Sequence, residues 1–503
     1  MKGLVPLRWR RVWSVTRWVA VAAALPLVWA CNSRTLAEPN PNPVRVVNNT
    51  FQATLNRKID ILFMVDNSQS MLPLQAKLLM QFPVFMNVLK MLPTGDGAGT
   101  GLPDVHVAVV SSDTGPGKYD LPDRHCAFRG DGGLFQAAPR GTCTASPLNA
   151  GQRYLSASMN QAQKNYNGDI SDAFTCIAAL GDQGCGFEGQ LKSVRWALDP
   201  FNVPVDPLGG GSNEGFLRQE AFLAVILITN EDDCSVPDDS DLVDPSQTTM
   251  SSTLGPLWSY RCNEFGHLCN INGTMQPPPR GLANNLMGCV SNETPSGKLT
   301  KVADEVAFLK GLKNDPNQIF VAAITGPVTP YGVEMIQQGS DPEAHPNIIH
   351  SCTQGTGEYA DPSVRIQQWI EAFGNHGLVE PICANSFAPA LQLIATELSK
   401  LLGPQCIGNN LVDSDLNTPG LQPRCQVNNR YLDNQSKTVE VPIQACSLTN
   451  NVAPCWSMDI DANKCPGNFL VVNVKLDTPP PDGLSTVVSC ATCIAGVPQE
   501  GCP

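Results

Sequence analysis

Three oxygen-bearing side chains alternate along the segment MVDNSQSM, where Asp66, Ser68 and Ser70 follow an apolar run. In an extended or gently turning backbone, alternate side chains project to the same side, so one carboxylate and two hydroxyls would converge. An all-oxygen half-shell suits a hard divalent cation, Mg²⁺ most of all, with Mn²⁺ or Ca²⁺ as alternatives. The competing interpretation is a buried strand that ends in a polar turn without metal, because Asp and Ser are common turn residues.

The elements that must position these side chains are apolar runs at 59–65, 105–110, 222–229 and 319–325. Runs that are apolar throughout indicate strands buried on both faces, as in a parallel sheet covered by helices. Helical spacing occurs at 72–92, 187–198, 301–313, 363–374 and 388–402, and Pro83 is expected to kink or split the first helix. The sequence therefore predicts an α/β fold with a doubly wound, mostly parallel sheet, and places Asp66 at the carboxyl end of a central strand, where such sheets bind ligands.

The motif D-x-S-x-S after an apolar strand resembles the metal-ion-dependent adhesion site of von Willebrand factor type A (vWA) domains. The resemblance covers about 51–402 and implies a vWA, Rossmann-like fold. The segments GCGFEGQL (184–191) and GFLRQEAFLAVILITNEDDCS (215–235), with the Cys-rich C-terminal part, also resemble the vWA lipoproteins common in myxobacteria. Family members complete the metal shell with a loop threonine and with an aspartate after the fourth strand. Here Asn230 occupies the aspartate position, and near the expected threonine only Glu188 offers an oxygen ligand.

An amide oxygen can coordinate a cation but brings no charge, so an acid next to Asn230 would have to compensate. We therefore predict a metal site made of Asp66, Ser68, Ser70, Asn230 and Asp232. The alternative is that the acids from Glu231 onward form a solvated acidic loop held in place by Cys234.

The N-terminal thirty residues predict export. Basic residues precede the apolar stretch 18–30, which is too short to span a bilayer and is typical of a signal peptide. Ala30 and Cys31 in LVWAC resemble a bacterial lipobox, which implies cleavage before Cys31 and acylation of that cysteine, although an ordinary cleaved signal is the alternative. Lipidation of Cys31 would leave 18 of the 19 cysteines to pair in an oxidising compartment.

The remaining sequence divides into three parts. Residues 31–50 are expected to form a tether without regular structure, 51–403 the vWA-like domain with long disulfide-stapled insertions, and 404–503 a small Cys-rich β domain. The ten cysteines between 126 and 383 are expected to pair within the vWA-like domain, unless a bridge such as Cys383 to Cys406 joins it to the next one.

The function expected from these features is cation-dependent binding in the bacterial cell envelope. The chain would be held by its lipid alone, in the outer membrane by preference, and would bind a protein or cell-surface ligand that offers a carboxylate. A net charge of −13 disfavours nucleic-acid binding, and no short His or Cys metal spacing or nucleophile motif indicates an enzyme. The alternative is a structural envelope scaffold whose metal is only stabilising or absent.

Overall fold

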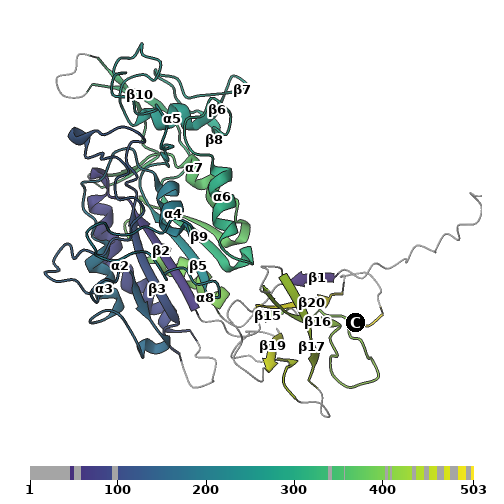
Figure 1. Ribbon diagram of the computed structural model, residues 1–503. Coiled ribbons are helices and arrows are strands. Elements are labelled where there is room, and N and C mark those ends of the chain that lie inside the picture. The colour runs from purple at the N-terminus through teal and green to yellow at the C-terminus, as the bar shows by residue number, and fades with distance from the viewer. Residues whose placement is uncertain are drawn as a thin grey trace, which may run out of the picture. The chain divides into compact units, whose positions relative to one another are not determined.

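The computed structural model describes residues 46–49, 58–92, 100–337, 343–355, 357–402, 406–407, 410–432, 438–446, 452–460, 470–475, 485–493 and 500–502 (Figure 1). The predicted signal peptide, Cys31 and most of the predicted tether lie outside these residues. Val46–Asn49 form a short strand, β1, where the sequence analysis expects no regular structure. Val46 and Val47 are β-branched residues, which favour an extended strand. Two such residues in a stretch rich in Pro and Asn are too few to predict that strand from the sequence.

A six-stranded sheet forms the centre of residues 58–402, which we call the α/β body, in the order β14-β9-β5-β2-β3-β4. Its strands are β2 (Lys58–Val65), β3 (Asp104–Ser111), β4 (Leu155–Ala157), β5 (Phe222–Ile228), β9 (Ile319–Thr325) and β14 (Gly377–Pro381). Neighbouring strands are parallel, except that the edge strand β4 is antiparallel to β3. The four predicted strands correspond to β2, β3, β5 and β9, which are almost completely buried.

Helices cover both faces of this sheet (Figure 1). Alternate residues of β2 point to opposite faces: Phe63 packs with α2, α3 and α8, whereas Leu62 packs with α4, α6 and α7. The helices are α2 (Leu72–Lys90), α3 (Ile170–Ala178), α4 (Gln190–Leu198), α6 (Val302–Gly311), α7 (Val364–Glu371) and α8 (Ala388–Leu402). Pro83 does not split the first helix, because α2 runs through it, and the alternative of a kink at Pro83 stays a prediction. Burial of the adjacent Phe82 and of Phe85 compensates for the backbone hydrogen bond that proline cannot make.

Disulfides close each long insertion of the α/β body. The bridges are Cys126–Cys185, Cys143–Cys176, Cys234–Cys262, Cys269–Cys289 and Cys352–Cys383, so the ten cysteines between 126 and 383 pair among themselves as predicted. The insertions also hold α5 (Tyr260–Gly266), β6 (His267–Ile271), β7 (Thr274–Gln276), β8 (Met287–Ser291), β10 (Val333–Ile336), β11 (His345–Ile348), β12 (Cys352–Gln354) and β13 (Glu358–Ala360). Short 3₁₀ turns occur at Gln69–Met71, Pro122–Arg124, Met159–Gln161, Pro316–Gln318 and Gly374–His376.

The C-terminal part is rich in strands and cysteines, as the sequence predicts. Its strands are β15 (Cys406–Ile407), β16 (Cys425–Leu432), β17 (Thr438–Ala445), β18 (Cys455–Ile460), β19 (Leu470–Lys475) and β20 (Ser485–Ala491), with bridges Cys446–Cys455 and Cys493–Cys502. The chain divides into two compact units. The smaller unit contains 410–424 and the residues from Cys490 onward, and the larger contains the α/β body and β16 to β19. Across the described ranges, no helix is both long and apolar enough to cross a membrane.

Candidate functional site

The ends of β2 and β5 meet at the middle of the sheet's carboxyl edge. The first three strands of the chain, β2, β3 and β4, lie side by side in that order toward one edge of the sheet. The next strand, β5, lies on the other side of β2, and β9 and β14 follow it toward the opposite edge. Open α/β sheets bind ligands at such a point of reversal. Asp66 follows β2 and donates its backbone N–H to the Ile228 carbonyl at the end of β5 (3.0 Å). Thr229 and Asn230 come directly after Ile228, so both strand ends deliver polar side chains to one place.

Asp66 is completely buried, and its carboxylate is held by three donors. One oxygen accepts from the Ser68 backbone N–H (2.8 Å) and the Ser112 hydroxyl (3.2 Å), and the other accepts from the Thr229 hydroxyl (2.6 Å). Burial raises the pKa of Asp66, while these hydrogen bonds oppose the rise by stabilising the charged form. These three donors therefore hold the carboxylate in position.

Three uncharged side-chain oxygens form a hydrogen-bonded row that begins at Ser68, two residues after this carboxylate. The hydroxyls of Ser68 and Ser70 are 3.2 Å apart, and the Ser70 hydroxyl donates to the Asn230 amide oxygen at 3.1 Å. The amide nitrogen of Asn230 donates to the Tyr359 carbonyl (3.0 Å), which orients the amide oxygen toward Ser70. Ser68 is nearly buried and Ser70 is half-buried. The structure thus brings together four of the five predicted ligands, which we call the oxygen cluster: Asp66, Ser68, Ser70 and Asn230.

Asp232 does not join the oxygen cluster. Its carboxylate accepts from the backbone N–H groups of Arg365 (2.9 and 3.1 Å) and Ile366 (3.1 Å) at the start of α7, and from Nε2 of His267 (2.7 Å). The other ring nitrogen of His267 lies 2.8 Å from the Tyr331 hydroxyl. Burial disfavours the charged carboxylate, but the contacts from His267 and Arg365 lower the pKa of Asp232 overall. These contacts give Asp232 a helix-capping role, which the spacing of the sequence did not indicate.

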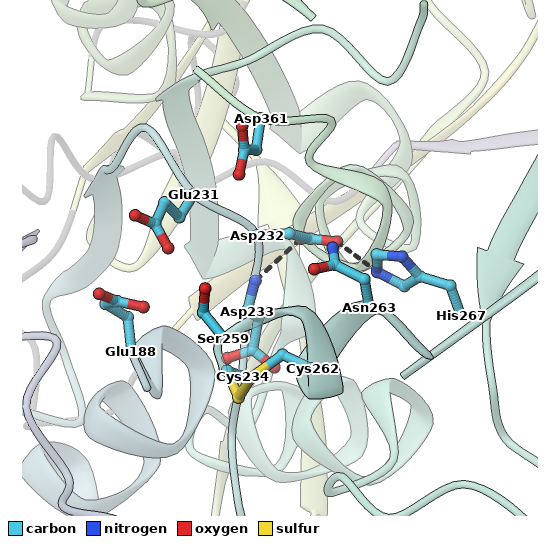
Figure 2. A pocket seen from close by; sticks show the side chains of 10 residues that line it. All are labelled: Glu188, Glu231, Asp232, Asp233, Cys234, Ser259, Cys262, Asn263, His267 and Asp361. Atoms are coloured by element: carbon cyan, nitrogen blue, oxygen red, sulfur yellow. Dashed lines mark hydrogen bonds and ion pairs between the residues drawn. A yellow bond between two sulfur atoms is a disulfide. The ribbon is translucent and has the colours of Figure 1, made fainter. Parts of the chain in front are cut away.

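A small acidic pocket adjoins Asn230. Its volume is about 20 Å³, room for a single water molecule, and its lining residues are Glu188, Glu231, Asp232, Asp233, Cys234, Ser259, Cys262, Asn263, His267 and Asp361. Figure 2 shows the side chains of Glu188 and Glu231 turned toward each other. Burial and the neighbouring charges of Glu231 and Asp66 raise the pKa of Glu188 well above its usual value. Burial, with the charges of Asp361 and Asp66, raises the pKa of Glu231 to about 8.

Sequence reasoning missed two contributors to this region. Ser112 hydrogen-bonds Asp66 and comes from the polar end of β3, so the segment VVSSD after an apolar strand was a usable signal. Asp361 follows β13, and its backbone N–H donates to the Asn230 carbonyl at 2.8 Å. No local pattern could have found Asp361, because 130 positions separate it from Glu231 along the chain (361 − 231).

The donor chemistry of the oxygen cluster fits a hard cation. In the described part of the chain, no three His, Cys, Asp or Glu side chains are arranged to hold a metal ion by themselves. A cation would therefore depend on the hydroxyls of Ser68 and Ser70 and the amide oxygen of Asn230, with Asp66 supplying the negative charge. Hydroxyl, amide and carboxylate oxygens are the ligand types that Mg²⁺, Mn²⁺ and Ca²⁺ accept.

Comparisons with known proteins give no family assignment. No protein-family model matches the chain, and no curated protein matches it. Among solved structures, the pilus adhesin SpaC from Lactobacillus rhamnosus GG, in its open conformation, is 14% identical with a TM-score of 0.27, covering 90% of this chain and 43% of that one. The human COPII-coat protein Sec24c is 10% identical with a TM-score of 0.25, covering 91% of this chain and 43% of that one. The chain thus spans less than half the length of either protein, and neither similarity supports an argument about fold or function.

Proposed function

We propose that the α/β body is a doubly wound domain of the von Willebrand type A class that binds a divalent cation, Mg²⁺ by preference, in the oxygen cluster. Support for the class comes from the strand order, from helices on both sheet faces, and from the D-x-S-x-S motif at the point of reversal between β2 and β5. The observation that carries the proposal is the hydrogen-bonded row from Ser68 through Ser70 to Asn230, which begins at the residue whose backbone N–H donates to the buried Asp66 carboxylate.

The residues of the oxygen cluster would have separate roles. Asp66 contributes the negative charge, and its three donors keep it from rotating away. Ser68, Ser70 and Asn230 offer oxygens to the cation. A bound cation supplies a Lewis-acidic position that a carboxylate of a partner protein or cell surface can occupy. This arrangement would select a partner by both charge and geometry. The proposed function is therefore binding rather than catalysis.

We further propose that the chain acts in the bacterial cell envelope, where acylated Cys31 would anchor it to the outer membrane. A second candidate function is a structural scaffold in which no partner reaches the site. The observation that favours the scaffold is the complete burial of Asp66 with all three donors already in place, because such a carboxylate is stable without a cation.

Calorimetric titration with Mg²⁺, Mn²⁺ and Ca²⁺ tests the cation site directly. The chain from Asn32 onward should bind one cation in the oxygen cluster, and Ser70→Ala should weaken binding without altering the far-ultraviolet circular dichroism spectrum. Ser414→Ala is a matched control, since Ser414 lies in the smaller unit. Identical titrations for all three proteins would refute the proposal. Partner capture with and without a chelator then separates the binding function from the scaffold.

A further inference from the structure

Tyr359 contacts two residues of the oxygen cluster through two different groups. Its backbone carbonyl accepts from the amide nitrogen of Asn230 at 3.0 Å, and its side chain hydrogen-bonds the side chain of Ser70. The imidazole of His350 stacks on the phenol ring, with the ring centres 3.8 Å apart and the planes inclined by 19°. Tyr359 is only half-buried, so part of this residue remains open to solvent. One residue thus reaches two proposed ligands of the cation.

The hairpin of β12 and β13 holds Tyr359 in this position. The two strands pair antiparallel, and the disulfide Cys352–Cys383 joins β12 to the segment that follows β14. Glu358, the residue before Tyr359, forms an ion pair with Lys77 of α2. The hairpin is therefore attached to two separate parts of the α/β body, and Tyr359 belongs to a fixed strand rather than to a free loop.

The Ser70 hydroxyl has a single hydrogen, which decides the direction of its hydrogen bonds. The amide nitrogen of Asn230 faces the Tyr359 carbonyl, so the amide oxygen faces Ser70 and can only accept. Ser70 therefore donates its hydrogen to Asn230, at 3.1 Å, and has only lone pairs left for Tyr359. Burial raises the pKa of Tyr359 to about 12, so its phenol keeps a proton at neutral pH. In the hydrogen bond between the two hydroxyls, Tyr359 is thus the donor and Ser70 the acceptor.

A cation bound by both Ser70 and Asn230 disfavours the hydrogen bond between them. That bond places a partly positive hydrogen between the two oxygens that must converge on the ion, so the ion repels it. The Ser70 hydrogen then needs another acceptor. Ser68, whose hydroxyl is 3.2 Å away, is itself a proposed ligand, whereas the phenol oxygen of Tyr359 has lone pairs to spare. Reversing the hydrogen bond between Ser70 and Tyr359 needs only the rotation of two hydroxyl hydrogens.

We propose that cation binding reverses the hydrogen bond between Ser70 and Tyr359, and that the freed phenol hydrogen of Tyr359 then donates to the partner's carboxylate. This inference rests on the proposed cation site and states how the cation and the partner are coupled there. Ligands of one ion lie side by side, so a carboxylate on the ion comes close to a phenol that contacts Ser70. The phenol then adds a charge-assisted hydrogen bond to the coordination of the carboxylate. Tyr359 is therefore a positioning residue for Ser70 and a specificity-determining residue for the partner.

Ultraviolet difference spectroscopy and calorimetry test this inference on the chain from Asn32 onward. Adding Mg²⁺ to the unaltered chain should shift the tyrosine absorption band, because the phenol of Tyr359 changes its hydrogen-bond partners. Tyr359→Phe keeps the ring and the backbone carbonyl but removes the hydroxyl. It should abolish the shift and weaken Mg²⁺ binding about fivefold. It should also weaken the binding of acetate, which stands in for the partner's carboxylate, to the Mg²⁺-loaded chain about tenfold.

Tyr166→Phe is the matched control, because the Tyr166 phenol donates to the side chain of Gln161 at 3.0 Å. This variant should keep the shift and both affinities.

Two results overturn the inference while the proposed function stands. In the first, the unaltered chain binds Mg²⁺ without a tyrosine shift, a measurement that needs no variant and so holds even if Tyr359→Phe folds poorly. In the second, folded Tyr359→Phe binds Mg²⁺ and acetate as tightly as the unaltered chain, so the Ser70 hydrogen goes to another acceptor such as Ser68. Absence of Mg²⁺ binding to the unaltered chain overturns both the inference and the proposed function.

Discussion

The Thr229 hydroxyl donates a 2.6 Å hydrogen bond to the carboxylate of Asp66, joining the end of β5 to the end of β2. The same Thr229 oxygen accepts from the side-chain amide of Gln190 at the start of α4 (3.1 Å). One hydroxyl group thus connects the end of β5, the end of β2 and the start of α4.

Replacing Thr229 with Val should destabilise the protein by about 1–3 kcal/mol, because the buried carboxylate of Asp66 loses the hydroxyl that donates to it at 2.6 Å. Urea unfolding should show the loss as a lower transition midpoint with an unchanged slope. Thr229→Ser keeps the hydroxyl and should restore most of the stability. Equal stability of the Val and Ser variants would mean that this hydrogen bond does not position Asp66.

Replacing Asn230 with Asp should increase the affinity for Mg²⁺ at least about tenfold, since it adds a charge to the oxygen cluster. Without cation, the same variant should be less stable by about 1–3 kcal/mol, because Asp cannot donate to the Tyr359 carbonyl and adds a charge beside Glu231. Thermal melting with and without Mg²⁺ should therefore show a larger cation-dependent shift than in the unaltered chain. Asn230→Ala, which removes the oxygen, should show a smaller shift, and similar shifts in all three proteins would argue against Asn230 as a ligand.

The stability of the protein should fall as pH rises from about 4.5 to 8. The pKa of Glu231 is about 8 in the folded protein and near 4.5 when unfolded, so the folded state binds the extra proton across this range. The contribution of Glu231 to the free energy of unfolding is complete below its pKa in the unfolded chain. It is lost as the pH rises toward and through its pKa in the folded protein, by up to about 1.4 kcal/mol per pH unit. Glu188, with its raised pKa, contributes in the same direction.

Denaturant unfolding at several pH values measures this slope. Glu231→Gln should flatten it, because the uncharged amide needs no proton. Glu214→Gln is a suitable control, since Glu214 is exposed and outside the acidic pocket. A slope that Glu231→Gln leaves unchanged would assign the pH dependence to other buried acids.

Replacing Asp232 with Asn should destabilise the protein by about 3 kcal/mol, because the buried contact with His267 loses its charge and the α7 cap is weakened. Cation affinity measured by calorimetry on the folded fraction should stay within about twofold of the unaltered chain, since Asp232 faces α7 rather than the oxygen cluster. The opposite result, normal stability with lost cation binding, would restore Asp232 as a ligand.

Cys31→Ser should abolish incorporation of radiolabelled fatty acid when the full chain is expressed in a lipoprotein-processing bacterium, because the thiol is the proposed acyl acceptor. Label in the unaltered chain and none in the variant is the expected outcome. Cys126→Ser tests whether the label follows this cysteine alone, since Cys126 is paired with Cys185. Absence of label from the unaltered chain would favour the ordinary cleaved signal.

The sequence predicts the central elements well because each is locally encoded. The fully apolar runs correspond to β2, β3, β5 and β9, and the alternation of Asp66, Ser68 and Ser70 is enough to group their side chains. The short edge strands β4 and β14 escaped prediction, because three or five residues with partial exposure give no periodic signal.

Long-range contacts account for what the sequence could not supply. Asp232 is a residue type that binds cations, but its carboxylate accepts hydrogen bonds from the backbone N–H groups of α7. The first residues of α7 lie more than 130 positions further along the chain. The acidic pocket likewise depends on Glu188, Glu231 and Asp361, which only the folded chain brings together.

The five disulfides of the α/β body do not involve the strands of its central sheet. None of the six strands contains a cysteine, and the five bridges span only 20 to 59 positions of sequence. Oxidation can therefore proceed on nearby thiols as successive stretches of the polypeptide emerge, without waiting for distant cysteines to meet. Reduction of these bridges would therefore release the insertions before it affected the strands of the sheet, which hold no cysteine.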